Sequence, residues 1–346
     1  MSAATGSHLD RELREQPQAL ARLLDEQAAG VAGIARALRG RELGNVMIAA
    51  RGSSDNAARY AQYLLGERVG LPVALAAPSL ESLYGAAAVP RHRGGLVIGI
   101  SQSGRSPDVV GVLAAASMAG TPTIAITNDA GSPLARAADF VLELRVGVEQ
   151  SVAATKTYTA SLAVLAALAA ELRDDDRDRA ALRQVPTLVE QTIDDAFAAV
   201  EAFDATADAP HVVAIGRGYN YATAMEIAIK IRELTATVAE GFSTADLMHG
   251  PIAAIAPGTP VIVVATPGKG LPSVLETADA LRQRGAETIV IGERPDADLP
   301  VPRGIPEWLS PLVAVVPGQV LALRRAVVGG HAIDQPVGLT KVTETL

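Results

Sequence analysis

Hydrophobic and polar residues follow two different patterns of spacing along the chain. Across 9–38, apolar side chains such as Leu13, Leu20 and Leu24 recur at intervals of three and four, which predicts an amphipathic helical arm that is broken near Pro17. After this arm, short runs of Val, Ile and Ala alternate with stretches of helical period. The apolar runs predict strands at 46–50, 73–76, 95–100, 123–127, 211–215, 261–265 and 288–291.

Helices are predicted between these strands and complete an α/β pattern. Short apolar strands that alternate with helices form parallel sheets covered by helices on both faces, so this is the predicted fold class. The predicted helices comprise one that ends at Val69, one that ends at Ala119, and four more at 155–172, 221–235, 273–284 and 319–328.

The succession of strands and helices occurs twice, which indicates an internal duplication. The segments 49–54 and 214–219 each end a predicted strand and open a helix. Between the halves, the charged run 173–179 is the sharpest change of composition. We therefore predict a helical arm at 1–40, a first domain at 41–173, a helical connection at 174–209, a second domain at 210–330 and a C-terminal tail at 331–346.

Composition narrows the possible functions. Hydrophobic residues make up 49% and charged residues 20% of the 346 residues, which is typical of a globular chain with a packed core. The net charge of −8 argues against a general nucleic-acid-binding protein, because such proteins need clustered Lys and Arg. The chain has no cysteine, which excludes disulfides, thiolate metal sites and a cysteine nucleophile. We expect no metal and no cofactor.

The apolar segments also indicate where in the cell the protein is located. The first ten residues are polar and lack the apolar core of a signal peptide. No apolar run reaches the roughly 20 residues that a bilayer-spanning helix needs. We therefore expect a cytoplasmic protein with no membrane partner.

A serine-rich turn follows the predicted strand at 95–100. It contains Ser101, Gln102, Ser103 and Ser106, and it precedes Pro107, a favoured first residue of a helix. The start of a helix offers unpaired N–H groups and the positive end of the helix dipole, and the hydroxyls add further donors. The turn is therefore predicted to bind an anion such as a phosphate.

A second pair of serines, Ser53 and Ser54, follows the strand at 46–50, and ligands of open α/β sheets bind at this end of the strands. Simple helix capping is the alternative role for each serine. Three hydroxyls within 101–106 favour the phosphate pocket. The counterpart segment in the second half, 265–268, reads Ala-Thr-Pro-Gly, so only the first half is predicted to hold phosphate.

Candidate groups for proton transfer lie in the second half. Lys230 and Glu233 are three residues apart and share one face of a predicted helix, where a simple ion pair is the alternative role. His249 precedes Gly250 and Pro251 in a predicted loop, where an imidazole can donate and accept protons near neutral pH. Lys341 lies near the C-terminus, where an exposed chain end is the alternative.

Taken in order, these motifs closely resemble the sugar isomerase (SIS) family, in particular double-SIS proteins similar to the isomerase half of glutamine:fructose-6-phosphate amidotransferase. The resemblance covers nearly the whole chain after the arm. It implies two tandem SIS domains, each a flavodoxin-like parallel sheet flanked by helices, with a C-terminal tail over the active site. The motifs that carry it are Gly-Ser-Ser at 52–54, Ser-Gln-Ser-Gly at 101–104, Val-Ala-Ala-Thr-Lys at 152–156, the Glu-Lys-Glu helix at 226–233, His-Gly-Pro at 249–251 and Asp-Gln-Pro at 334–336 followed by Lys341.

The resemblance also implies roles for single residues. Glu233 carries a proton between C1 and C2 of the sugar, with Lys230 beside it. His249 opens the sugar ring from the partner subunit of a homodimer, and Lys341 meets the open-chain carbonyl. The residues implied to hold the phosphate are Ser101, Gln102, Ser103, Ser106 and Ser53, and those implied to contact the sugar are Gly52, Ser54, Val152 and Ala153.

Three departures from the synthase pattern shape the prediction, and one of them is a tail after Lys341 that differs slightly from the synthase ending. The sequence contains no glutaminase domain and no cysteine, so we do not expect ammonia release from glutamine. Arg51 stands where the synthases have Cys, and Ala154 stands where a Ser often contacts the sugar. Both choices are more similar to stand-alone sugar-phosphate deaminases and deglycases.

The sequence therefore favours a deaminase that converts glucosamine 6-phosphate, or a close epimer, to fructose 6-phosphate and ammonia. A deglycase acting on fructosamine 6-phosphates is the nearest alternative and needs space for an amino-acid substituent. A non-catalytic module that senses sugar phosphates is an alternative of another class. Such a module has no need of Glu233 and His249 together.

Overall fold

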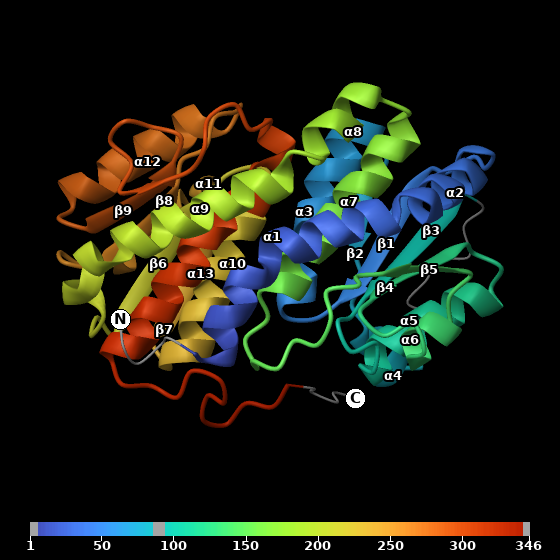
Figure 1. Cartoon of the computed structure of the whole chain (residues 1–346), viewed down its shortest axis with the longest axis horizontal. Helices are drawn as coiled ribbons and strands as arrows, with labels where there is room; N and C mark the ends of the chain where they lie inside the picture. Colours follow the sequence, from blue (N-terminus) through green and yellow to red (C-terminus); the bar gives the residue numbers. More distant parts are fainter. Residues whose placement is uncertain (1–5, 86–93, 342–346) are drawn as a thin grey trace. The chain divides into compact units, whose positions relative to one another are not determined.

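The computed structural model describes residues 6–85 and 94–341 and divides into two compact units (Figure 1). The division passes between Arg183 and Gln184, inside the stretch 174–209. Unit 1 comprises Met1–Pro17, Glu149–Thr155 and Gln184–Leu339, and unit 2 comprises Gln18–Val148, Lys156–Arg183 and Thr340–Leu346.

Unit 2 is built on a five-stranded sheet in which all strands are parallel, in the order β2-β1-β3-β4-β5. Apolar side chains of Ala49, Val97 and Ala125 form a buried cluster with residues of α5 and α6 on one face of the sheet. Helix α3 packs against β1, β2 and α7, and α2 packs against α7. The strands are β1 (Asn45–Ala50), β2 (Val73–Leu75), β3 (Gly95–Ile100), β4 (Thr123–Thr127) and β5 (Phe140–Glu143).

The helices of unit 2 include two that the sequence pattern already indicated. The helix after β3 begins at Pro107, and α7 is buried along most of its length. The helical elements are α2 (Ala28–Arg39), α3 (Ser53–Tyr63), η1 (Leu64–Val69), α4 (Ser79–Ser82), α5 (Pro107–Met118), α6 (Pro133–Arg136), α7 (Lys156–Arg173) and α8 (Asp176–Leu182).

Unit 1 repeats the same sheet with a second set of strands. Its order, β10-β9-β8-β6-β7, is the order of unit 2 when the strands are counted from β6 onward. All pairs are again parallel, which confirms the predicted α/β class with two parallel sheets. The strands are β6 (His211–Gly216), β7 (Val238–Ser243), β8 (Pro260–Val264), β9 (Glu287–Gly292) and β10 (Leu299–Pro300).

Helices cover both faces of the unit 1 sheet. Helix α10 packs against β6, β7 and α13, and α13 packs against α9 (Figure 1). Val213, Val263 and Val274 belong to a buried cluster with residues of α11 and α12. The helical elements are α1 (His8–Glu26), which continues into unit 2, α9 (Val185–Ala199), η2 (Val200–Thr206), α10 (Asn220–Thr235), α11 (Thr244–Met248), η3 (Pro251–Ala254), α12 (Leu271–Gln283), η4 (Glu307–Leu309) and α13 (Ser310–Val328).

The predicted break of the arm near Pro17 is wrong, because α1 runs without interruption from His8 to Glu26. A proline inside a helix removes the N–H that would bond the carbonyl four residues earlier, here that of Leu13. The side-chain amide of Gln16 donates to this same Leu13 carbonyl at 3.2 Å. The amide therefore satisfies the acceptor that the proline leaves open. The arm divides only at Gln27, before α2.

Several further elements differ from the sequence prediction. Strands β5, β7 and β10 were not predicted, because β5 and β10 are only four and two residues long and β7 contains Gly241 among alternately exposed positions. Helix α13 begins at Ser310 rather than near 319, since Pro311 occupies the first turn, where no donor is needed. At Gly318 a Cβ would lie 2.3 Å from Cγ1 of Ile227 on α10, so glycine permits the two helices to approach closely.

Helix α13 is also the one helix of the described residues that is long and apolar enough to cross a membrane, over Glu307–Val328. In that segment 83% of the most apolar window is buried inside the protein. It packs against α9 and α10, as a core helix does.

Candidate active site

A stripe of charged side chains runs along one face of α10. Glu226, Lys230 and Glu233 are spaced four and three residues apart and therefore lie above one another on the helix. The ammonium Nζ of Lys230 donates to Oε2 of Glu233 at 2.5 Å and lies 3.6 Å from Oε1 of Glu226. The side chains of Glu226 and Lys230 are 0% and 1% exposed, whereas that of Glu233 is 28% exposed. Glu233 is therefore the member of the stripe that can reach a ligand.

The environment of Lys230 fixes its charge. Burial by itself lowers the pKa of this lysine, but the carboxylates of Glu233, Glu226 and Glu149 outweigh burial and raise the pKa of Lys230 above its ordinary value. Lys230 is therefore an ammonium at neutral pH. An ammonium cannot act as a base or form an imine, so its role is to hold the Glu233 carboxylate by a charge-assisted hydrogen bond.

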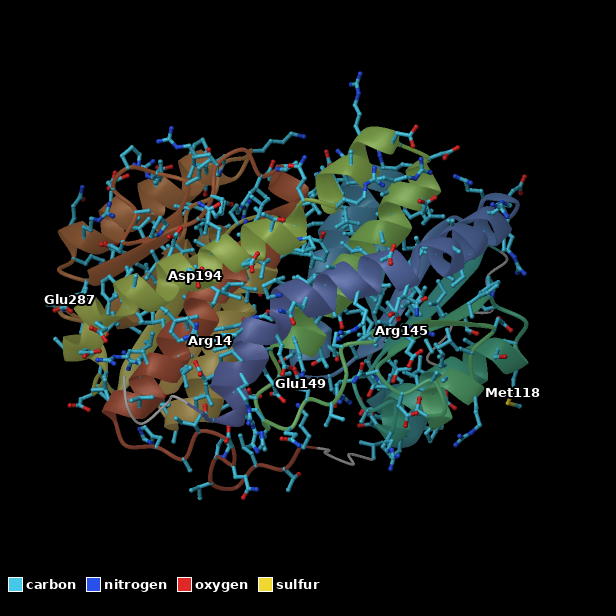
Figure 2. All side chains as sticks on the ribbon, in the orientation of Figure 1. Arg14, Met118, Arg145, Glu149, Asp194 and Glu287 are labelled. Carbon is cyan, nitrogen blue, oxygen red and sulfur yellow. The ribbon has the colours of Figure 1, made fainter. Side chains whose placement is uncertain are left out.

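The segment Glu149–Thr155, which contains Glu149, is fixed to unit 1 by its backbone (Figure 2 labels Glu149). The carboxylate of Glu12 on α1 accepts the N–H groups of Gln150 and Ser151, the latter at 3.2 Å. The N–H of Val152 donates to the carbonyl of Asp334 at 3.3 Å. Glu149 itself is buried and accepts the N–H of Thr155 at 3.0 Å.

These contacts hold the predicted sugar-contact residues of the segment in place. Val152 is half-buried and Ala153 is buried.

Two members of this charge cluster were not predicted from the sequence. Glu226 precedes Lys230 by four residues, a helical spacing that could have indicated it. Glu149 is distant from α10 in the sequence, and its type and neighbours carry no local signal. Only the fold places its charge near Lys230.

The serine-rich turn of unit 2 forms a closed loop at the end of β3. The hydroxyl of Ser101 accepts the N–H of Gly104 at 3.2 Å and lies 3.4 Å from the hydroxyl of Ser106. The carbonyl of Gln102 accepts the N–H of Asn128 at 3.0 Å, which ties the loop to the end of β4. Gly104 has φ +62°, and a Cβ there would lie 2.1 Å from Oγ of Ser132, so this turn requires glycine.

Capping does not explain Ser106. It precedes α5 at the N-cap position with φ −65° and ψ 110°, yet its side chain makes no capping hydrogen bond. Its hydroxyl instead faces that of Ser101 at the same helix start. The two hydroxyls therefore lie together at the start of α5, where the positive end of the helix dipole favours an anion.

The second predicted turn lies at the end of the neighbouring strand. β1 pairs with β3 along its whole length, and Ala50 is opposite Ile100. The turns that follow these residues therefore leave adjacent strand ends. Gly52 has φ +57° and precedes α3, whose first two residues are Ser53 and Ser54, both half-buried.

The remaining predicted catalytic residues are His249 and Lys341. His249 ends α11, is exposed, and its imidazole makes no hydrogen bond to any residue that the structure describes. Lys341 is half-buried, belongs to unit 2 and is the last described residue, so residues 342–346 of the predicted tail lie outside the described part. Within residues 6–85 and 94–341, no group of three or more His, Asp or Glu side chains could hold a metal ion.

Two successive parallel sheets of identical strand order, one with a serine loop and one with a buried lysine–carboxylate pair, define a duplicated α/β protein. The SIS domain family matches residues 41–171 and 206–300. The chain belongs to this family, and the predicted tandem SIS organisation is confirmed.

Comparison with known proteins places the chain among named members of this family. It is 33% identical over 356 residues to the glutamine–fructose-6-phosphate aminotransferase (isomerizing) of Gloeobacter violaceus, covering 96% of this chain and 57% of that relative. The chain thus spans little more than half the length of the curated relative.

Solved structures agree with this placement. A protein of Silicibacter pomeroyi assigned as a phosphosugar isomerase is 33% identical, with a TM-score of 0.84 over 95% of this chain and 99% of the other. The glucosamine-6-phosphate deaminase of Thermotoga maritima is 22% identical, with a TM-score of 0.81 over 98% of this chain and 100% of the other, which shows a shared fold.

Proposed function

We propose that the protein is a sugar-phosphate isomerase of the deaminating type, which converts glucosamine 6-phosphate or a close epimer, with water, to fructose 6-phosphate and ammonia. The observation that carries the proposal is the partly exposed carboxylate of Glu233, held at 2.5 Å by a buried Lys230. A carboxylate that is fixed in place and reachable by a ligand suits proton transfer between neighbouring carbons.

Binding begins with the phosphate. The hydroxyls of Ser101 and Ser106, the half-buried side chains of Gln102 and Ser103, and the start of α5 bind the phosphate oxygens, with Ser53 at the neighbouring turn. The residues that the resemblance implies for contact with the sugar are Gly52, Ser54, Val152 and Ala153.

The chemical steps balance without a further co-reactant. In the open-chain aldehyde, Glu233 takes the proton from C2 and returns a proton to C1, which leaves an imine at C2 and a hydroxymethyl group at C1. Water then adds to the C2 imine, and the C2–N bond breaks to release ammonia and form the ketone. Lys230 stays protonated throughout and holds the carboxylate in position.

Ring opening and carbonyl contact are assigned to His249 and Lys341. His249 is exposed on α11 and makes no side-chain hydrogen bond to described residues. As the resemblance implies, we assign it to the site of a second subunit in a homodimer. The raised pKa of Lys230 argues against an imine at that lysine, and the resemblance implies Lys341 for contact with the open-chain carbonyl. We expect the enzyme in the cytoplasm, with no nucleic-acid or membrane partner.

The relatives favour this reaction class. Similar proteins are named as an isomerizing aminotransferase of fructose 6-phosphate, a phosphosugar isomerase and a glucosamine-6-phosphate deaminase. Chemistry at C1 and C2 of a six-carbon sugar phosphate is common to the first and the last. Deamination needs only water besides the sugar phosphate.

The test is ammonia release from glucosamine 6-phosphate by the purified protein. We expect ammonia and fructose 6-phosphate in equal amounts, and a rate roughly 100- to 10,000-fold lower for Glu233→Gln, the usual range for loss of a general base. Glu240→Gln is the control, because Glu240 is exposed on β7 and pairs with His211 at 2.9 Å.

Other outcomes identify the alternatives. Activity on fructosamine 6-phosphates but not on glucosamine 6-phosphate would replace the deaminase with a deglycase. Tight binding of sugar phosphates without turnover of either substrate would replace it with a sensing module.

A further inference from the structure

Arg51 is held at the end of β1 by a buried carboxylate. Its Nε donates to Oδ2 of Asp108 at 2.7 Å. The Asp108 side chain is 0% exposed, whereas that of Arg51 is 50% exposed. The carboxylate of Asp108 is therefore fixed inside the protein, and the guanidinium of Arg51 reaches the surface.

The position of Arg51 follows from the strand before it. Ala49 belongs to the buried cluster beneath α5, together with Val109 and Val112 of that helix. Side chains two residues apart on a strand point to the same face, so Arg51 also points toward α5. It meets the helix at its first turn, because Asp108 directly follows Pro107 there.

The buried carboxylate of Asp108 holds the guanidinium of Arg51 in place. One of its oxygens accepts the N–H of Val109 at 2.8 Å, and the other accepts Nε of Arg51. A buried carboxylate without a cation is strongly destabilising. The ion pair thus fixes the guanidinium plane beside the start of α5.

The guanidinium of Arg51 has further hydrogen-bond donors that its contact with Asp108 does not use. With Nε bound to Asp108, the two terminal nitrogens donate to no other described residue, and they form a planar fork suited to phosphate oxygens. The serine loop supplies only neutral donors, from Ser101, Ser106 and the helix start. Arg105, the cation within that loop, is 62% exposed and faces Asp129 at 3.6 Å.

A phosphate monoester carries close to two negative charges at neutral pH, as phosphorylated side chains do. Asp108 adds a further negative charge at the same helix start. Neutral hydroxyls offset none of this negative charge, whereas the guanidinium of Arg51 offsets one unit of it.

We propose that Arg51 is the cationic contact of the phosphate site and that Asp108 is its positioning residue. The ligand class is a phosphate monoester dianion or inorganic phosphate. The inference rests on the proposed function only in naming the sugar that carries the phosphate.

The test is calorimetric titration of the full-length protein with inorganic phosphate and, separately, with glucosamine 6-phosphate. We expect Arg51→Gln to weaken the binding of both ligands by a similar factor, roughly 10- to 100-fold, which is the usual effect of losing a charged hydrogen bond. Arg51→Lys keeps the charge but loses the fork and should fall between wild type and Arg51→Gln. Asp108→Asn, which keeps the shape of the anchor, should weaken binding less than Arg51→Gln.

Arg282→Gln is the matched control, because Arg282 is a surface arginine of α12 that pairs with Asp279 at 2.9 Å. The substitution removes the same charge, and the variant should bind both ligands with wild-type affinity. Circular dichroism of each variant confirms folding.

Equal phosphate affinity for wild type and Arg51→Gln would overturn the inference. So would a loss confined to glucosamine 6-phosphate, since Arg51 would then contact the sugar. If wild type binds phosphate through Arg51 but releases no ammonia, the inference stands and the proposed deaminase fails.

Discussion

Lys230 is a buried cation among three carboxylates, and this surplus of negative charge decides its protonation. The attraction of Glu233, Glu226 and Glu149 exceeds the effect of burial on its pKa. Sequence alone indicated the Lys230–Glu233 pair from its spacing. It could not indicate the burial that separates this pair from an ordinary surface ion pair, because burial depends on how α10 packs against α13 and β7.

A pH titration tests this environment. Because the pKa of Lys230 is raised on folding, its contribution to stability is complete below the unfolded value of about 10.4 and is lost only as pH rises through the folded pKa. We expect its side-chain nitrogen to titrate above that value in an NMR titration, with Lys230→Arg used to assign the signal. Titration of this nitrogen below about 10.4 would contradict the assigned role.

The serine loop shows how much of a binding site local sequence can indicate. Ser101, Gln102, Ser103 and Ser106 were predicted to bind phosphate because a strand, a serine turn and a proline-led helix follow one another. The contact of Arg51 with Asp108 joins residues 57 positions apart. Neither residue type nor spacing marks this pair, so it required the register of β1 against β3.

At the level of elements, the start of α1 is fixed by a residue from the other end of the chain. The carboxylate of Asp334 accepts the N–H groups of His8 and Leu9 at 2.9 and 3.0 Å. The hydroxyl of Ser7 accepts the N–H of Asp10 at 3.1 Å. A carboxylate at a helix start both satisfies unpaired donors and complements the helix dipole.

We expect Asp334→Ala to lower the free energy of unfolding by about 1–2 kcal/mol, the usual cost of losing a helix cap. Urea denaturation followed by circular dichroism measures the change. Asp25→Ala, at an exposed position near the end of the same helix, is the control and should change stability by less than about 0.5 kcal/mol. Equal effects of the two substitutions would show that Asp334 does not fix the helix start.

Most elements could be predicted from periodicity, and the errors have local physical causes. β3 and β4 have the predicted bounds because they are short, apolar and fully buried. Pro17 looked like a helix break because a pattern of residue types does not show that Gln16 replaces the missing donor. β7 was not predicted because Gly241 interrupts its hydrophobic pattern. Glycine is needed at this position because a Cβ there would lie 2.7 Å from Cα of Met225 on α10.

At the scale of the whole molecule, the two sheets have the same order but different ligand turns. In unit 1 the segment 265–268 follows β8, the counterpart of β3. A Cβ at Gly268 would lie 2.2 Å from Cδ of Glu307. A carboxylate therefore occupies the space beside this turn.

The proposed homodimer predicts recovery of activity when two inactive variants are mixed. Glu233→Gln and His249→Gln each abolish a shared site, but a dimer of one chain of each kind keeps one intact pair. With random exchange of subunits, an equal mixture should regain about one quarter of wild-type activity, since half the dimers are mixed and each has one of two sites intact. Either variant incubated alone is the control. Failure to regain activity after verified exchange would contradict a shared site.

The most direct test of the account is transfer of hydrogen from C2 of glucosamine 6-phosphate labelled there with deuterium. The account predicts that wild-type protein removes the deuterium and releases ammonia, and that part of the label reaches C1 of fructose 6-phosphate by NMR because one carboxylate serves both carbons. Glu233→Gln should leave the label at C2. Wild-type protein that binds the substrate but leaves the deuterium at C2, or a Glu233→Gln variant that removes it at the wild-type rate, would contradict the account.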